Sequence, residues 1–174
     1  MSKRYLLFSD THGRNAVVQH VLTTYGPFDG AVFCGDGEGL ENILQSMPGC
    51  PAELFMVAGN CDHYTTLAED AVFPLGKHKV FLTHGHKYAL RRDLTTIAAF
   101  AEKNGCDLCF FGHTHIPADE TINGVRCINP GSLGLPRQEP AFPTIVILTI
   151  TEEGEAIPEL CKLKNSGTHS FLQA

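Results

Sequence analysis

The chain has 174 residues and a formal net charge of −6, with 43% hydrophobic and 18% charged residues. These proportions are those of a folded globular protein and exclude a chain that is disordered throughout. The acidic balance argues against a basic face built to bind the phosphates of a long nucleic acid. The longest apolar runs, such as 54–57 and 145–148, are too short to span a membrane.

The N-terminal segment and the cysteines both favour the cytoplasm as the compartment. Residues 1–4 carry charge, but no long apolar stretch or cleavage site follows them, so we expect no secretory signal. The seven cysteines form an odd count, which fits reduced thiols better than a disulfide framework. Cys106 and Cys109 form a lone CxxC pair, which cannot by itself complete a tetrahedral zinc site. We expect both to be buried, unreactive thiols.

Short apolar runs alternate with longer amphipathic stretches in the first two thirds of the chain, a pattern typical of βαβ units and a largely parallel sheet. Apolar residues recur at helical spacing over 17–25, and Gly26-Pro27 predicts where that helix ends. A second stretch with helical spacing covers 90–101. The apolar runs that predict strands are 5–9, 31–34, 54–58, 80–83 and 108–111.

After residue 111 the pattern becomes antiparallel. Asn123-Gly124, between two strand-like segments, predicts a tight hairpin. The segments 144–151 and 156–163 predict a second antiparallel pair. We expect two packed sheets with helices outside them, in a single domain over 1–164, and a flexible C-terminal tail over 165–174.

Each of the five predicted strands is followed by side chains that can bind a metal ion. Because the carboxyl ends of strands in a parallel sheet share one edge, we expect these side chains to lie together. Glycine precedes three of them, where a side chain would crowd the approach of the backbone. The segments are Asp10-Thr11-His12, Gly35-Asp36, Gly59-Asn60-Cys61-Asp62, Thr83-His84-Gly85-His86 and Gly112-His113-Thr114-His115.

Taken one at a time, these residues also have ordinary structural interpretations. Asp10 could cap a helix, and Asn60 could occupy a left-handed turn. A single histidine such as His84 is more often a hydrogen-bonded core group than a ligand. His113 and His115 would point to one face of a strand. All five segments together, each after an apolar run, favour a metal site.

The residue types select the class of metal. Carboxylates, imidazoles and one amide suit Mn²⁺, Fe²⁺, Zn²⁺, Ni²⁺ or Mg²⁺ rather than a thiolate site. The donors are too many for one ion with open positions and are enough for two ions that share a carboxylate. Two such ions roughly 3.5–4 Å apart are a recurring arrangement for phosphate ester hydrolysis.

The ordered motifs resemble those of the calcineurin-like metallophosphoesterases, over about residues 5–135. The small size, Gly59-Asn60-Cys61-Asp62 and the later Asn129-Pro130-Gly131-Ser132 are similar to the compact YfcE-type phosphodiesterases. The resemblance implies an α/β fold, a four-layer αββα sandwich in which two mixed β-sheets are flanked by helices, with a two-metal site at the strand ends.

The resemblance also implies residue roles. One ion would be held by Asp10, His12 and His115, and the other by Asn60, His84 and His113. Asp36 would bridge the two ions, and a hydroxide between them would attack phosphorus. His86 would contact the substrate or support a ligand. The catalytic residues implied in this way are Asp36, Asn60, Asp62 and His86.

Cys61 departs from the wider superfamily, in which many members have a histidine there that is proposed to protonate the leaving group. A thiol with an ordinary pKa of about 8.5 is a poorer proton donor than an imidazolium. We therefore expect esters with good leaving groups, such as aryl esters, to be cleaved best. His63, His86 or water would then supply the proton.

The sequence thus predicts a metal-dependent phosphoesterase acting on a small phosphodiester. Mn²⁺ is the first expectation for both ions, with Mg²⁺, Fe²⁺, Ni²⁺ and Zn²⁺ as alternatives. A phosphomonoesterase with the same site stays open, and so does a non-catalytic scaffold, since a retromer-coat relative has this fold with a degenerate ligand set. We expect no stable nucleic-acid or membrane partner, and homodimers or homotetramers occur in the family.

Overall fold

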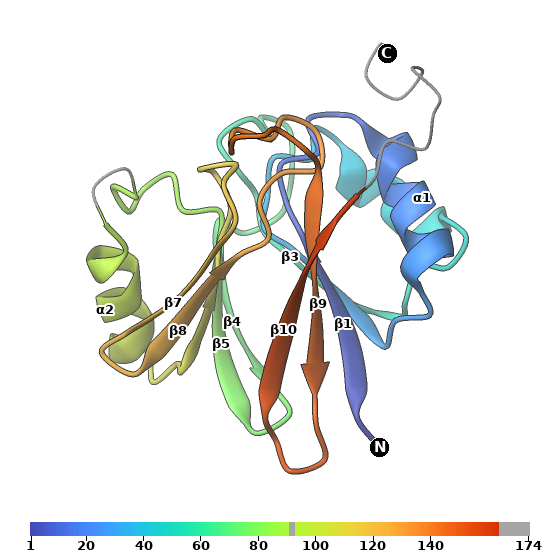
Figure 1. Cartoon of the computed structure of the whole chain (residues 1–174). Coiled ribbons are helices and arrows are strands. Elements are labelled where there is room, and N and C mark those ends of the chain that lie inside the picture. The colour runs from blue at the N-terminus through green and yellow to red at the C-terminus, as the bar shows by residue number, and fades with distance from the viewer. Residues whose placement is uncertain (91–92, 164–174) are drawn as a thin grey trace.

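Two five-stranded mixed sheets pack face to face in the computed structural model, which describes residues 1–90 and 93–163. The strand order is β10-β9-β1-β2-β3 in the first sheet and β4-β5-β6-β8-β7 in the second. Figure 1 shows helix α1 outside the first sheet and helix α2 outside the second. Within the described ranges no helix is long and apolar enough to cross a membrane. The tail expected over 165–174 lies outside the described residues.

The first sheet is built from both ends of the chain. β1 pairs in parallel with β2, which pairs in parallel with β3, whereas β9 lies antiparallel to β1 and to β10. Helix α1 follows β1, and two short 3-10 turns, η1 and η2, follow β2. The bounds are β1 (Lys3–Phe8), α1 (Asn15–Tyr25), β2 (Gly30–Phe33), η1 (Leu40–Asn42), η2 (Leu44–Ser46), β3 (Glu53–Met56), β9 (Thr144–Ile150) and β10 (Ala156–Lys162).

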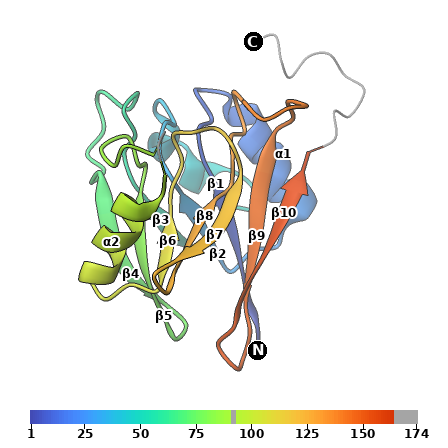
Figure 2. The same cartoon turned by 60° about the vertical axis from the view of Figure 1, so that its left-hand side comes forward.

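The second sheet has a parallel centre and antiparallel edges. β5, β6 and β8 run parallel, β4 pairs antiparallel with β5, and β7 pairs antiparallel with β8. Helix α2 packs on its outer face, as Figure 2 shows. The bounds are β4 (Asp70–Leu75), β5 (His78–Thr83), α2 (Thr95–Lys103), β6 (Leu108–Phe110), β7 (Ala118–Ile122) and β8 (Val125–Asn129).

Three apolar clusters hold these layers together. The central cluster lies between the sheets and contains Leu7 and Val32 of the first and Leu82 and Phe110 of the second. Because side chains alternate along a strand, the neighbouring residues point outward. Those of the first sheet pack against α1, and those of the second pack against α2. The predicted four-layer αββα sandwich is therefore confirmed.

The predicted hairpin at Asn123-Gly124 is also confirmed, because β7 and β8 meet there and both turn residues have positive φ. The expected division into a parallel half and an antiparallel half is wrong. β9 and β10 return to the first sheet, because the apolar inner face of β9 completes the central cluster beside β1. The parallel strands are consequently divided between the two sheets instead of sharing the edge of one.

Three local expectations also differ from the structure. β4 was not predicted. The second helix begins at Thr95 rather than Leu90, although Leu90 and Leu94 are buried as the helical spacing suggested. His113 and His115 do not lie on a strand, because β6 ends at Phe110 and both histidines have positive φ.

Candidate metal centre

The loops that carry the candidate metal ligands follow the carboxyl ends of strands from both sheets, at the top of Figure 1. The segment after β1 carries Asp10, and the segment after β2 carries Asp36. From the second sheet, the segment after β5 carries His84 and the segment after β6 carries His115. Because the two sheets pack face to face, residues up to 105 positions apart in the chain lie close together.

The backbone of these loops is unusual. Non-glycine residues with positive φ are uncommon, and they concentrate where the surrounding structure holds a side chain in a required direction. Six such residues occur in these loops: Asp10 (53°), His12 (47°), Asp36 (60°), Glu38 (51°), His113 (66°) and His115 (61°). Five of the residues proposed as metal ligands therefore have a positive φ angle.

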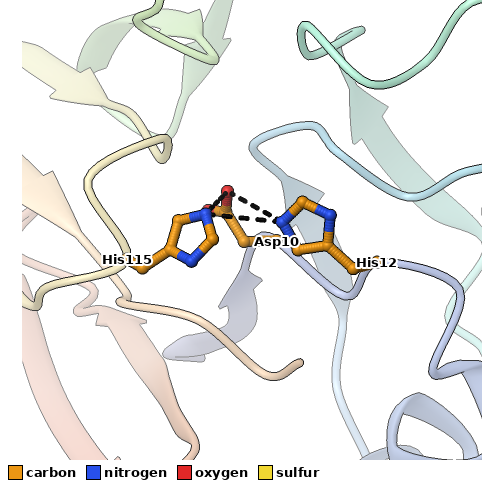
Figure 3. Close-up of side chains that lie close together, drawn as sticks. All are labelled: Asp10, His12 and His115. Atoms are coloured by element: carbon orange, nitrogen blue, oxygen red, sulfur yellow. Dashed lines mark hydrogen bonds and ion pairs between the residues drawn. The ribbon is translucent and has the colours of Figure 1, made fainter. Parts of the chain in front are cut away.

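Asp10, His12 and His115 form the first compact donor group (Figure 3). Oδ1 of Asp10 lies 3.0 Å from Nε2 of His115 and 3.9 Å from Nε2 of His12. The two Nε2 atoms are 3.4 Å apart. This separation and chemistry let one divalent cation contact all three residues.

Asp10, Asp36 and His84 form a second donor group that shares Asp10 with the first. Nε2 of His84 lies 3.3 Å from Oδ2 of Asp36 and 4.0 Å from Oδ1 of Asp10. Oδ2 of Asp36 is in turn 4.0 Å from Nε2 of His12. Oδ2 of Asp36 therefore lies within 4.0 Å of a histidine nitrogen from each group.

Three of the histidines are held by their outer ring nitrogens. Nδ1 of His84 lies 2.8 Å from the carbonyl oxygen of Cys34, and Nδ1 of His115 lies 2.6 Å from that of Leu135. Nδ1 of His12 lies 3.0 Å from a carboxylate oxygen of Glu38. Because these oxygens only accept hydrogen bonds, each Nδ1 is the protonated donor, and each Nε2 offers its lone pair to the centre.

The interior of the centre contains polar atoms without partners. Oδ1 of Asp10 and Nε2 of His84 are buried, and neither makes a hydrogen bond. Leaving such atoms unpaired costs about 1–3 kcal/mol each, so native proteins pair them with protein, water or an ion. A lone-pair nitrogen beside a carboxylate oxygen is the donor pair that a divalent cation satisfies, so the residues fit a metal ion.

Buried charge sets the pKa values here. Burial acts to raise the pKa of Asp36, but its interactions with His84 and the N–H of Cys61 outweigh this and hold the pKa well below its ordinary value. Burial acts to lower the pKa of His84, yet Asp36 and Asp10 raise it overall. Burial and then His84 lower the pKa of both His86 and His113. The low pKa values of these two histidines favour the neutral, lone-pair form.

Asp62 lies beneath the centre and not inside it. Its Oδ2 accepts hydrogen bonds from the backbone N–H of Asp36 (2.9 Å) and Gly59 (2.8 Å). Its Oδ1 accepts from the N–H groups of Gly37 (2.9 Å) and Glu38 (2.7 Å). Both oxygens are therefore used in joining the loop after β2 to the loop after β3.

Cys61 contacts Asp36 through its backbone. Its N–H donates to Oδ1 of Asp36 at 2.8 Å. Burial, followed by the charge of Asp36, raises the pKa of the Cys61 thiol to about 11. Cys61 also forms a third possible donor group with His12 and Glu38. Because Glu38 already accepts the hydrogen bond of His12 Nδ1, we interpret that group as support for the ligand His12.

The remaining proposed site residues lie at the edge of the two donor groups. The ring of His113 packs edge-on against that of His84, with centroids 5.1 Å apart, and the backbone N–H of His113 donates to Oδ2 of Asp10. The His86 ring lies 5.6 Å from that of His84. Asn60 is exposed, and its amide contacts the sulfur of Cys61 at 3.3 Å. The ligand roles of Asn60 and His113 rest on the family resemblance.

Glu38 and the segment 129–132 support the centre in ways that the sequence did not reveal. Ser132 donates to the carbonyl oxygen of Asp10 at 2.8 Å. The Asn129 amide donates to the carbonyl oxygen of Gly112 (2.9 Å) and to the hydroxyl of Thr114 (3.0 Å). Asn129 and Ser132 thus connect ligand loops from both sheets. No spacing rule marks Glu38, because its contact with His12 depends on how two loops fold.

The glycines before the ligands are required by close packing, as predicted. A Cβ atom on Gly59 would overlap the carboxylate of Asp36, and one on Gly112 would overlap the Ser9 hydroxyl. A Cβ on Gly35 would come within 2.9 Å of the His84 ring. Outside the centre, Cys106 and Cys109 are buried free thiols, as expected.

Comparison with known proteins agrees with this geometry. A sequence model of the calcineurin-like phosphoesterase superfamily domain matches residues 4–153. The chain belongs to this superfamily. Membership supports a metal-dependent phosphoester hydrolase, and the two donor groups described above are candidate metal ligands.

Individual relatives are similar to this chain over most of their length. The chain is 30% identical to the probable metallophosphoesterase YsnB of Bacillus subtilis, over 87% of each chain. It is 29% identical to phosphodiesterase YfcE of Escherichia coli, over 77% of this chain and 81% of that one. Vacuolar protein sorting 29 of Cryptosporidium parvum has the same fold, with a TM-score of 0.72 and 16% identity over 94% of this chain and 98% of that one.

Proposed function

We propose that the protein is a phosphodiesterase with a dinuclear metal centre. Asp10, His12 and His115, which form one donor group, would hold one ion. His84, together with Asn60 and His113 as the family resemblance implies, would hold the other, and Asp36 would bridge the two. The observation that carries the proposal is that possible metal donors face the interior of the site without hydrogen bonds. Oδ1 of Asp10 and Nε2 of His84 are buried without hydrogen bonds, while the outer nitrogens of three histidines are held by oxygens of the chain.

Two divalent ions bound here would supply an activated water nucleophile and positive charge for the phosphate oxygens. The side chains of the protein fix the positions of the donors. Asp36 keeps its charge because its pKa is depressed, and the Cys61 N–H holds one of its oxygens. Oxygen acceptors at Nδ1 of His12, His84 and His115 direct the Nε2 atom of each ring toward the donor groups. This preorganisation costs nothing at the moment of reaction.

The structure supports different roles for the other residues of the predicted catalytic set. Both oxygens of Asp62 accept backbone hydrogen bonds, so we assign it as a positioning residue for the loop of Asp36. His86 lies at the edge of the centre and is 20% exposed, and we propose that it contacts the substrate. The Cys61 thiol, with its raised pKa, is a weak proton donor, which favours esters with good leaving groups.

The preference for diesters is proposed from the relative that is named a phosphodiesterase. The test is hydrolysis of bis-p-nitrophenyl phosphate and of p-nitrophenyl phosphate by protein treated with EDTA and reloaded with Mn²⁺, Mg²⁺, Ni²⁺ or Zn²⁺. We expect metal-dependent release of p-nitrophenol, with kcat/KM for the diester at least about tenfold higher. The reverse order would make the protein a phosphomonoesterase.

The scaffold alternative has its own outcome. If no ester is turned over with any metal, and a stable protein partner is captured, the scaffold alternative replaces catalysis.

We propose Mn²⁺ as the ion in use, the cytoplasm as the compartment, and a homodimer or homotetramer as the assembly. Anomalous scattering from crystals across the Mn, Fe and Zn absorption edges would identify the ions, and light scattering would give the assembly.

A further inference from the structure

A cavity of about 740 Å³ lies between the loop that precedes β9, the end of β10 and the residue before α1. Its wall contains three basic residues, Arg14, Arg137 and Lys162, together with apolar residues such as Leu135 and Phe142. We call this cavity the basic pocket. It is unexpected in a protein whose net charge is −6.

The basic pocket and the metal centre share a wall. The loop that lines the pocket also holds the first donor group, since the Leu135 carbonyl accepts from His115 Nδ1 at 2.6 Å. The Arg137 N–H donates to the His115 carbonyl at 3.2 Å, and the Gly134 N–H donates to that of Asp10 at 3.0 Å. Arg14 also lies two residues after His12, so the pocket adjoins the backbone segments that carry the first donor group.

In the part of the chain that the structure describes, the three cations have no anionic partner. Over residues 1–90 and 93–163, no carboxylate forms an ion pair with Arg14, Arg137 or Lys162. The ammonium group of Lys162 instead lies 4.5 Å from the centre of the Phe142 ring. Several cations with no counter-charge in one concave site create a positive potential that attracts an anion.

The shape and chemistry of the basic pocket limit what it can bind. Two guanidinium groups suit phosphate, because their planar N–H donors match its oxygens. The apolar wall offers contact to a ring or a short carbon chain between two charged groups. A single phosphodiester group at the metal centre would leave these cations unused.

We propose that the basic pocket binds a second phosphate group carried by the substrate. The physiological substrate class is then a small phosphodiester with a further phosphate on one of its ester groups. This inference rests on the proposed phosphodiesterase function and goes beyond it, because it names which diesters are preferred. Simple diaryl phosphates are poor substrates by comparison.

The test uses two esters that differ only in the second phosphate. One is the p-nitrophenyl ester of thymidine 5′-phosphate, and the other is the same ester with a phosphate on the 3′ oxygen. For the wild-type, metal-loaded protein we expect kcat/KM to be at least about tenfold higher for the second ester. The ratio of the two values is compared, so that any uniform effect on turnover cancels.

The variants assign the preference to the pocket. In Arg137→Gln/Lys162→Gln the ratio should fall to about one, and each single substitution should lower it part of the way. The control Lys3→Gln/Lys103→Gln changes the net charge equally at two exposed positions on β1 and α2, and it should keep the wild-type ratio. Equal kcat/KM for both esters in wild type, or an unchanged ratio in the pocket variant, would overturn the proposal.

A binding measurement separates failure of the pocket from failure of the proposed function. If neither ester is hydrolysed, the phosphodiesterase proposal fails, but calorimetry on the metal-free protein still tests the pocket. Thymidine 3′-phosphate should bind at least about tenfold more tightly than thymidine, and the pocket variant should lose this difference. Equal affinities in wild type would show that the basic pocket does not recognise a phosphate group.

Discussion

The Nε2 atoms of His12 and His115 face each other at 3.4 Å, and each ring is held in that direction by an acceptor oxygen at its opposite nitrogen. Two lone pairs at this distance repel one another, so the arrangement is favourable only with a cation or a proton between them. With Oδ1 of Asp10 3.0 Å from the His115 nitrogen, a divalent ion satisfies all three donors together.

Replacing Asp36 by asparagine should weaken metal binding more than any other single change. The neutral amide keeps the shape but loses the charge that lies between the two donor groups, 3.3 Å from His84. We expect kcat/KM to fall by more than about 100-fold, because even indirect ligand partners are worth 10–100-fold. Calorimetric titration with Mn²⁺ and p-nitrophenol release measure the two effects.

The matched control for Asp36→Asn is Glu102→Gln, which removes an exposed carboxylate on α2. It should leave metal affinity and turnover unchanged. Full, EDTA-sensitive activity in Asp36→Asn would show that Asp36 does not bridge the ions.

Glu38→Gln should weaken one metal-binding step and leave the other unchanged. Glu38 accepts the Nδ1–H of His12 at 3.0 Å but touches no other member of the two donor groups. Loss of a carboxylate behind a histidine ligand costs about 10–100-fold in metal affinity. Two-site calorimetry should show this loss at one step, with Glu41→Gln as the control. An equal loss at both steps would argue against a local role.

Asp62→Ala should destabilise the fold as well as the metal centre. Four backbone N–H groups lose their acceptor, and those that stay shielded from water cost about 1–3 kcal/mol each. We expect the free energy of unfolding in urea to fall by at least about 2 kcal/mol. Glu120→Ala, at an exposed site on β7, should have little effect. An unchanged stability with lost turnover would indicate direct contact between Asp62 and the substrate.

Cys61→Ala should keep metal binding and the turnover of aryl diesters within about threefold. The Cys61 contact with Asp36 uses the backbone N–H, which alanine retains. The thiol, with a pKa of about 11, is a weak proton donor for the leaving group. Metal content by mass spectrometry and p-nitrophenol release test both points. Weaker metal binding would make Cys61 a ligand, whereas lost turnover with intact metal binding would make it the general acid.

Asp107 should make stability depend on pH. Burial acts to raise its pKa, but His78, 2.6 Å from Oδ2, and the Lys79 N–H, 2.9 Å from Oδ1, lower it overall. A pKa that is lower in the folded state stabilises the fold above the unfolded value of about 3.9. That stabilisation is lost as the pH falls through the folded-state pKa.

Asp107→Asn should therefore lower Tm by a few degrees at pH 7 and by progressively less below pH 3.9, down to no difference once Asp107 is protonated in both states. Thermal unfolding between pH 2 and pH 8 measures the difference from wild type. Glu102→Gln is again the control. A Tm difference that stays constant over this range would show that the carboxylate charge of Asp107 does not stabilise the fold.

Much of the architecture follows from local sequence patterns. Alternating and continuous apolar runs predicted most strands, and Asn123-Gly124 predicted its hairpin because few dipeptides adopt two positive φ angles. β4 was missed because it contains Pro74 and leaves Val72 exposed, so its pattern is weak. Its pairing with β5 in the second sheet compensates for that weakness.

The sequence predicts which residues supply the metal donors, but not which groups orient their side chains. Asp10, Asp36 and His84 stand out because each follows an apolar run, and the structure brings all three into one donor group. The acceptors that orient the rings are carbonyl oxygens of Cys34 and Leu135, and any residue carries a carbonyl. No residue type marks such positions.

The identity and order of the side chains after successive apolar runs are enough to predict the superfamily and the candidate donors. How those donors meet depends on the packing of the fold. β9 returns beside β1 to bury its apolar face, and the two sheets then pack so that loops from both share one end. The basic pocket likewise depends on distant residues, Arg14, Arg137 and Lys162, which only the packed layers bring together.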